Sequence, residues 1–342
     1  MLGKLFARPA MAAGLLSLLA GVVCAQPVEL KIGDFQSTQH IQSREGTQLF
    51  MREVEKRTAG KIKFSHFPNE QAAKAKGLLD AAKSGVLDIA VAGILYSSER
   101  LPLASIVGLP GFGDTALEGT KALLPLVTKG VLRAEFEAEG VVPIYAYVLT
   151  PYQILLKSKS VGDPKDWAGL KVRTGGTTQA LTVRAFGASG INLAGPEVYT
   201  AVERGTVDGV LFPIPSVPGY NLQEVVKYIS DNGSFGNFGM AVVMNKAAFD
   251  KLTEDQRKAV LEAGHAAALN VAKAQDDSTA ELLKEWKAKG ITIFSFTPAQ
   301  QKAYTDAMKA VGEEWVSRIG KKLPQAKDIY AAYEKAVVEA RK

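Results

Sequence analysis

The chain has 342 residues, of which 47% are hydrophobic and 22% charged, and its formal net charge is +6 at pH 7. This length allows two domains, each with its own hydrophobic core. Basic and acidic residues alternate along the chain, and aromatic residues are not interleaved with the basic ones, so nucleic-acid binding has little support. The mild positive charge suits an anionic small ligand.

The first 25 residues predict a signal peptide. Lys4 and Arg8 precede a short apolar run at residues 10–23, and a small residue follows at the expected cleavage site, so the mature chain would begin near Gln26. The run is shorter than the roughly 20 residues that a membrane anchor requires. Cys24 leaves a lipoprotein signal as an alternative, but the valine before it is not the small residue that lipidation favours.

Motifs for catalysis and for metal binding are missing from the sequence. Cys24 is its single cysteine, so the mature chain would have no disulfide, no thiolate nucleophile and no cysteine metal site. The three histidines, at positions 40, 66 and 265, show none of the usual zinc spacings. There is also no serine nucleophile elbow, P-loop or dinucleotide-binding motif. We therefore expect a protein without a metal or cofactor that is not an enzyme.

In chain order, strands alternate with helices, which predicts an α/β fold with largely parallel sheets. The strands expected first are residues 28–33, 60–67 and 87–92, and the helices between them are residues 47–56 and 71–83. This βαβαβ unit would form the greater part of a first lobe at residues 26–150.

The remaining elements predict a second lobe and several crossings. A strand at 141–147 would leave the first lobe, Pro151 would mark the crossing, and a strand at 153–157 would open a second lobe at 151–238. A strand at 240–244 would return the chain to the first lobe (239–278). A capping box at Thr253 starts a helix that reaches about Lys289. A strand at 291–296 and a helix capped by Thr297 would complete the second lobe at 279–342.

Residues 169–176, GLKVRTGG, predict a short strand that carries Arg173 and then a glycine turn into a helix. Arg173 would lie at the C-terminal end of the strand, where open α/β sheets bind ligands. Thr174 and the backbone N–H groups of the turn would face the same anion. The alternative is a salt bridge within the protein, which is the common role of an arginine.

Residues 197–213, EVYTAVERGTVDGVLFP, predict a helix, a turn and a second strand. Val198, Ala201 and Val202 share the buried side of the helix. Asp208 is followed by glycine, a pair that favours a turn, so a structural role is expected for it.

Together, the segment from Trp167 to Pro213 resembles the signature of solute-binding proteins of TRAP (tripartite ATP-independent periplasmic) transporters, the C4-dicarboxylate-binding component family. The resemblance extends over essentially the whole mature chain. It implies a two-lobed α/β periplasmic binding protein with a hinge, a central ligand cleft and a long helix spanning both lobes. It also implies that Arg173 pairs with the carboxylate of an organic acid in the periplasm, and that the partners are the small and large permease subunits.

Two departures from the family pattern bear on the ligand. Many relatives carry Glu-Asn just after the Asp-Gly pair, where this chain has Leu211 and Phe212. The change favours an apolar acid, such as an aromatic or keto acid, although Phe212 is equally compatible with core packing. Binders of sialic acid and dicarboxylates often have a second arginine near Gln153. One arginine predicts a monocarboxylate, with the Gln153 amide available to a second polar group of the ligand.

In the first lobe, three loops that follow strands supply weaker candidates. Gln36 follows the first strand, Glu70 the second and Tyr96 the third, each where a strand-to-helix loop would face the cleft. Tyr96 is the strongest of these, because a tyrosine can both stack on a ligand and hydrogen-bond to it. Ordinary packing is the alternative for Tyr96.

Three other functions remain as alternatives: the binding protein of an ABC importer, a sensory receptor for organic acids, and a secreted enzyme. The first two would share the signal peptide, lobes and cleft, whereas the enzyme lacks a recognisable nucleophile or metal set.

Overall fold

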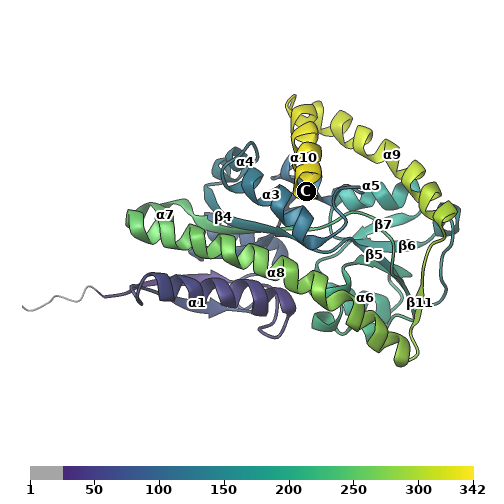
Figure 1. The fold of residues 1–342 in the computed structure, drawn as a ribbon, viewed down its shortest axis with the longest axis horizontal. Helices are drawn as coiled ribbons and strands as arrows, with labels where there is room; N and C mark the ends of the chain where they lie inside the picture. Colours follow the sequence, from purple (N-terminus) through teal and green to yellow (C-terminus); the bar gives the residue numbers. More distant parts are fainter. Residues whose placement is uncertain (1–25) are drawn as a thin grey trace, which may run out of the picture.

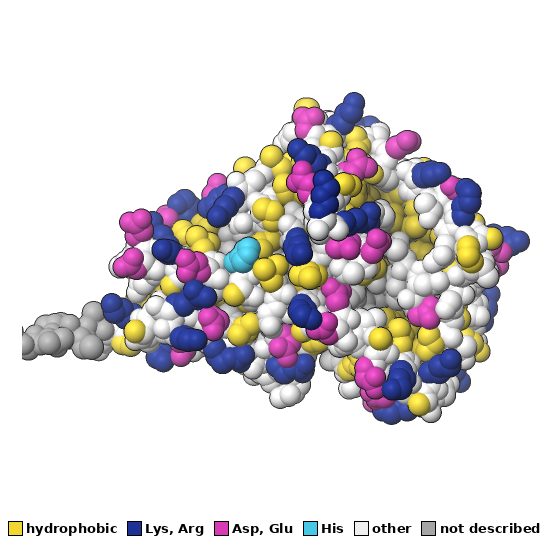
Figure 2. Space-filling view, viewed as in Figure 1, with side chains coloured by type: hydrophobic (Ala, Val, Ile, Leu, Met, Phe, Trp, Pro, Cys, Tyr) yellow, Lys and Arg dark blue, Asp and Glu magenta, His cyan; other side chains and the backbone are white. Residues whose placement is uncertain are grey.

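The computed structural model describes residues 26–342, so the predicted signal peptide lies outside the described residues. The chain forms a mixed α/β fold with two separate sheets, each covered by helices (Figure 1). No helix within residues 26–342 has the length and apolar character needed to cross a membrane. Acidic and basic side chains are interspersed over the face shown in Figure 2.

The first sheet has five strands in the order β2-β1-β3-β10-β4. β1 is parallel to β2 and β3, whereas β10 is antiparallel to β3 and β4. The β4 strand is buried along its whole length, as expected for a near-continuous apolar strand covered on both faces. The strands are β1 Val28–Gly33, β2 Ile62–Phe67, β3 Ile89–Gly93, β4 Val141–Val148 and β10 Gly239–Asn245. The helices of this lobe are α1 Gln48–Arg57, α2 Leu78–Lys83, α3 Ala116–Thr128, α4 Arg133–Ala138 and α7 Lys246–Lys251.

The second sheet has six strands in the order β11-β9-β5-β8-β6-β7. β6 is parallel to β7 and β8, while β5 is antiparallel to β8 and β9. Both sheets are therefore mixed rather than largely parallel, because β5 and β10, which follow crossings between the lobes, enter their sheets in the antiparallel sense. The elements are β5 Gln153–Leu156, β6 Lys171–Thr174, α5 Thr177–Ala185, β7 Ser189–Asn192, α6 Val198–Glu203, β8 Gly209–Phe212, β9 Tyr228–Ser230 and β11 Thr292–Phe294.

The longest element is α8, Glu254–Ala288, which has 35 residues and is therefore about 50 Å long. It begins at the capping box predicted at Thr253. The helix packs on α1, α3 and β4 of the first lobe and, further along, on β11 of the second (Figure 1). Together with the segments joining β4 to β5 and β9 to β10, it supplies three of the connections between the lobes.

The C-terminal helices divide between the lobes. α9, Pro298–Gly320, packs on α5 of the second lobe, but α10, Ala326–Ala340, packs on α3 of the first (Figure 1). The ring of Phe112 contacts those of Tyr330 and Tyr333, and Arg341 pairs with Asp114 at 3.0 Å. The prediction that all of 279–342 belongs to the second lobe was therefore wrong for α10. The apolar stripe of a helix shows that the helix packs on another surface, but it does not indicate on which lobe that surface lies.

The helix predicted at 71–83 is shorter than expected. Only Ala75–Gly77, a 3₁₀ turn, and α2 are helical. Asn69 and Glu70 precede this segment with backbone φ angles of 55° and 60°. These left-handed conformations turn the chain at the end of β2, so the first helical residue lies further along the chain than predicted.

An aromatic cluster fastens α9 to the second lobe. Trp167 is fully buried, and its indole Nε1 donates a hydrogen bond to the hydroxyl of Tyr304 on α9 at 2.8 Å. The rings of Phe186 and Phe235 lie 5.0 and 5.2 Å from the Trp167 ring. The cluster thus joins the turn before β6, the end of α5 and the helix α9 in one packed unit.

Candidate functional site

Arg173 is buried at the end of β6, with 1% of its surface exposed. Its Nε donates a hydrogen bond to the carbonyl oxygen of Leu193 at 2.9 Å, and one terminal nitrogen donates to that of Leu211 at 3.1 Å. The guanidinium carbon lies 5.2 Å from the ring centre of Phe212. Within the described part of the chain, Arg173 forms no ion pair with a carboxylate. Two carbonyls hold the side chain in place, and the hydroxyls of Tyr96 and Tyr152 also lie within hydrogen-bonding reach of it. A carboxylate could replace these neutral partners with a charged acceptor.

Aromatic side chains from both lobes surround Arg173. The rings of Tyr96 and Phe238 are 4.9 Å apart, and that of Phe212 is 5.7 Å from Tyr220. The cavity they enclose has a free volume of about 20 Å³, room for about one water molecule. An organic acid can therefore enter only when the lobes separate. The aromatic residues that line it are Phe35, Tyr96, Tyr152, Phe212, Tyr220 and Phe238.

Hydrogen bonds between the lobes close the cavity. The Tyr96 hydroxyl accepts from the backbone N–H of Gly195 at 2.9 Å, and the Gln42 amide donates to the hydroxyl of Ser216 at 2.8 Å. Burial raises the pKa of Tyr96, although the nearby Arg173 cation works in the opposite direction. The phenol is therefore neutral near pH 7. Such contacts form and break as the lobes close and open.

Four of the predicted site residues lie together. Arg173, Phe212, Tyr96 and Gln36 all line the same cavity, two from each lobe. Phe212 follows Leu211 at the end of β8, beside the arginine, so its ring forms a wall of the cavity as well as packing against its neighbours.

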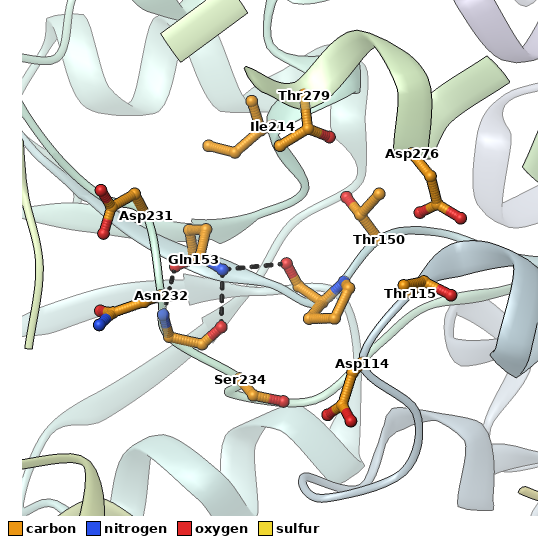
Figure 3. Close-up of a pocket in the computed structure, with 12 residues that line it drawn as sticks. Asp114, Thr115, Thr150, Gln153, Ile214, Asp231, Asn232, Ser234, Asp276 and Thr279 are labelled. Atoms are coloured by element: carbon orange, nitrogen blue, oxygen red, sulfur yellow. Dashed lines mark hydrogen bonds between the residues drawn. The ribbon is translucent and has the colours of Figure 1, made fainter. Parts of the chain in front are cut away.

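Gln153 lies outside this cavity. Successive side chains of a strand face opposite sides, and Tyr152 is the neighbour that lines the arginine cavity. The Gln153 amide oxygen accepts from the Ser230 hydroxyl at 2.8 Å and from the Gly233 N–H at 2.7 Å. Its amide nitrogen donates to the carbonyl of Gly233 in a different, more open cavity of about 360 Å³ (Figure 3). The structure therefore separates Gln153 from Arg173.

Thr174 and Glu70 also lie outside the arginine cavity. Thr174 is fully buried, and its hydroxyl has no hydrogen-bond partner among the described residues. The Glu70 carboxylate accepts from the N–H of Ala75 at 2.8 Å and pairs with Lys74 at 2.9 Å. Its role in this structure is to hold the turn that precedes α2.

Several residues of the cavity were not predicted from the sequence. Tyr152 is next to Gln153, which was predicted, but the family pattern does not indicate which of the two faces the cavity. Tyr220 and Phe238 carry no local motif, and tertiary folding brings them beside Arg173. Gln42 and Ser216, which hydrogen-bond across the lobes, likewise have no sequence signal.

No group of three or more histidine, cysteine, aspartate or glutamate side chains is arranged to hold a metal ion within residues 26–342. Asp34, at the end of β1, is a buried carboxylate that accepts hydrogen bonds from the Gln36 N–H and the Thr47 hydroxyl, both at 2.9 Å. Burial raises the pKa of Asp34 from 3.8 to about 6, against the effect of these hydrogen bonds. The neutral form of Asp34 therefore predominates up to about pH 6 in the folded protein.

This shift predicts a pH dependence of stability. Because the folded pKa of Asp34 lies above the unfolded one, its contribution is fully present below about pH 4 and is lost as the pH rises through about 6. Relative to Asp34→Asn, the wild-type free energy of unfolding should fall by up to about 3 kcal/mol between about pH 4 and 7. Urea titrations of both proteins across this range measure the difference, and a constant difference would contradict the assignment.

Two α/β lobes that meet around a buried arginine and an aromatic cavity are the architecture of a two-lobed receptor for a small molecule. The chain belongs to the family of bacterial extracellular solute-binding proteins, family 7, whose pattern matches residues 32–318. These are the periplasmic solute-binding proteins of TRAP transporters. Members of the family are receptors rather than enzymes, and they serve a small-molecule ligand and a membrane transporter.

Similar proteins include one sequence relative and two solved structures. The chain is 26% identical to the 2,3-diketo-L-gulonate-binding periplasmic protein YiaO of Escherichia coli K12 over 326 residues, which are 94% of this chain and 95% of YiaO. A TRAP solute-binding protein from Rhodoferax ferrireducens, in complex with copurified benzoate, has a TM-score of 0.86 and 22% identity, with 92% of this chain and 98% of that chain covered. One from Bordetella bronchiseptica, with bound (R)- and (S)-mandelate, has a TM-score of 0.83 and 25% identity, with coverages of 92% and 99%.

Proposed function

We propose that this protein captures an aromatic monocarboxylate in the periplasm and delivers it to the small and large permease subunits of a TRAP transporter. The observation that carries the proposal is a buried guanidinium with no carboxylate partner among the described residues, enclosed by aromatic rings of both lobes. A desolvated cation is costly unless an anion accompanies it. A ligand carboxylate would supply that anion.

The cavity favours one negative charge and an apolar body. Arg173 is the single cationic side chain among the described residues that line it. A second carboxylate would therefore be buried without a partner, which disfavours dicarboxylates. The aromatic walls suit a ring better than a polyhydroxylated chain. The benzoate and mandelate bound by the two similar structures support this class, and the diketo acid in the name of YiaO keeps a keto acid as the second choice.

The binding mechanism follows from the geometry. A carboxylate that enters between the separated lobes would meet the guanidinium of Arg173 on the second lobe. Closure would bring Tyr96 and the Gln42–Ser216 contact over it and exclude water. The charge-assisted hydrogen bonds strengthen in this drier environment, so ligand binding favours the closed arrangement.

A thermal-shift screen of the chain from Gln26 onward tests the function. Benzoate, mandelate and phenylpyruvate would be compared with succinate, glucuronate and sialic acid, each at the same concentration. A ligand present at about 100 times its dissociation constant stabilises the folded state by about 2.7 kcal/mol, so a cognate acid should raise the melting temperature clearly. Stabilisation by the aromatic acids is expected. If only dicarboxylates or sugar acids stabilise the protein, the proposed ligand class is wrong. If none of the acids stabilises it, the proposed role of Arg173 is wrong.

A further inference from the structure

Three buried glutamines form a relay that ends in the arginine cavity. Gln275 lies on α8, while Gln42 and Gln36 lie in the segment that follows β1, and all three are at most 2% exposed. The Gln42 amide nitrogen is 3.5 Å from the amide oxygen of Gln275, and the Gln36 amide nitrogen donates to the amide oxygen of Gln42. Gln36 and Gln42 line the cavity.

Backbone carbonyls decide which way each amide of the relay points. The Gln275 amide nitrogen faces the carbonyl oxygens of Val271 at 3.2 Å and Val148 at 3.5 Å, and a carbonyl can only accept. The Gln275 oxygen must then accept from Gln42, and the Gln42 oxygen must accept from Gln36. Each amide therefore fixes the next, which removes the usual ambiguity in assigning amide oxygen and nitrogen.

The last atom of the relay is a buried acceptor without a partner. The Gln36 amide oxygen has no hydrogen-bond partner among the described residues. The backbone of Gln36 is fixed by two hydrogen bonds: its N–H donates to the Asp34 carboxylate, and its carbonyl oxygen accepts from the Asn69 N–H at 2.8 Å. The side-chain amide oxygen therefore cannot easily move to find another partner. An unsatisfied buried acceptor is costly, so a group that donates to it gains affinity.

From this orientation we infer that the ligand carries a hydrogen-bond donor, a hydroxyl or amino group, remote from its carboxylate, and that the Gln36 amide oxygen accepts from it. This inference rests on the proposed function, in which the carboxylate binds Arg173. Arg173 belongs to the second lobe and Gln36 to the first, so one ligand would bridge them. The substrate class is then a hydroxylated or amino-substituted aromatic monocarboxylate rather than an unsubstituted one.

Matched ligands test the inference without any mutation. Isothermal titration of the chain from Gln26 onward would compare benzoate with its 3-hydroxy, 4-hydroxy, 3-amino and 4-amino derivatives, and each hydroxy acid with its methoxy counterpart. A methoxy group has nearly the same position but cannot donate. At least one donor-bearing acid is expected to bind about ten- to a hundredfold more tightly than both benzoate and its methoxy counterpart. Equal affinities within each set would overturn the inference.

A variant at Gln36 assigns the effect to the relay. Gln36→Leu should reduce the preference for the donor-bearing acid, measured against benzoate in the same variant, to less than about threefold. Gln39→Leu, an exposed glutamine of the same segment, is the matched control and should keep the preference. A preference that persists in folded Gln36→Leu would show that another group receives the donor. If wild-type protein binds none of these acids, the proposed function fails as well, whereas equal binding of all of them refutes only the role of Gln36.

Discussion

An Arg173→Ala variant is expected to lose tight binding of every carboxylate that the wild-type protein binds. Arg173 is 1% exposed, lines the cavity and is held by two backbone carbonyls, so its guanidinium is already in position for a carboxylate. Removing one partner of a buried, hydrogen-bonded charge pair costs about 2–5 kcal/mol of binding free energy. Arg173→Lys should also bind weakly, because an ammonium lacks the planar fork that grips both carboxylate oxygens.

Isothermal titration with the best acid of the thermal-shift screen measures this loss. The matched control is Arg184→Ala on α5, which removes an exposed arginine paired with Glu314 and should leave the affinity unchanged. Thermal unfolding of both variants would establish that they are folded. Affinity of Arg173→Ala within a few-fold of wild type would mean that another group binds the carboxylate.

Trp167→Ala is expected to cause the largest loss of stability. Its indole is fully buried between Phe186, Phe235 and Tyr304, and truncating such a side chain costs about 3–5 kcal/mol. Because this cluster joins the turn before β6 to α9, the loss should affect the second lobe as a unit. Urea denaturation followed by circular dichroism measures the free energy of unfolding.

Trp167→Phe separates packing from hydrogen bonding in the same cluster. It keeps a ring but removes the donor to the Tyr304 hydroxyl, so the hydrogen-bond part of its loss should be near 1 kcal/mol. A loss as large as that of Trp167→Ala would point to the hydrogen bond rather than to the packed ring. A negligible effect of Trp167→Ala would show that α9 does not depend on this cluster.

The elements with a strong local pattern were predictable. The apolar run at 141–147 became the buried strand β4, and the capping box at Thr253 became the start of α8. The docking of α10 was not predictable, because its apolar stripe matches either lobe and only the tertiary structure places Tyr330 and Tyr333 on Phe112. The left-handed backbone at Asn69 and Glu70 was missed for a similar reason, since neither residue requires it.

For the candidate site, the sequence located the arginine but not its surroundings. Arg173 was recognisable from a strand end followed by glycines, whereas Tyr220 and Phe238 reach it only through folding. Gln153 was named from the family pattern, and Tyr152, one residue earlier, is the one that lines the cavity, because successive residues of a strand face opposite sides. The glutamine relay has no sequence pattern at all, because its members lie at positions 36, 42 and 275 and meet through long-range packing.

The small cavity between the lobes has a consequence for kinetics. A ligand beside Arg173 would need more room than the about 20 Å³ free there, so it could enter or leave only when contacts between the lobes, such as the Tyr96–Gly195 hydrogen bond, are broken. Its dissociation rate can then be no faster than the rate at which the lobes open. Acids of different affinity would share this upper limit on release. A membrane partner that pulls the lobes apart would accelerate unloading without touching the ligand, so residence time would be controlled by docking rather than by the chemistry of the acid.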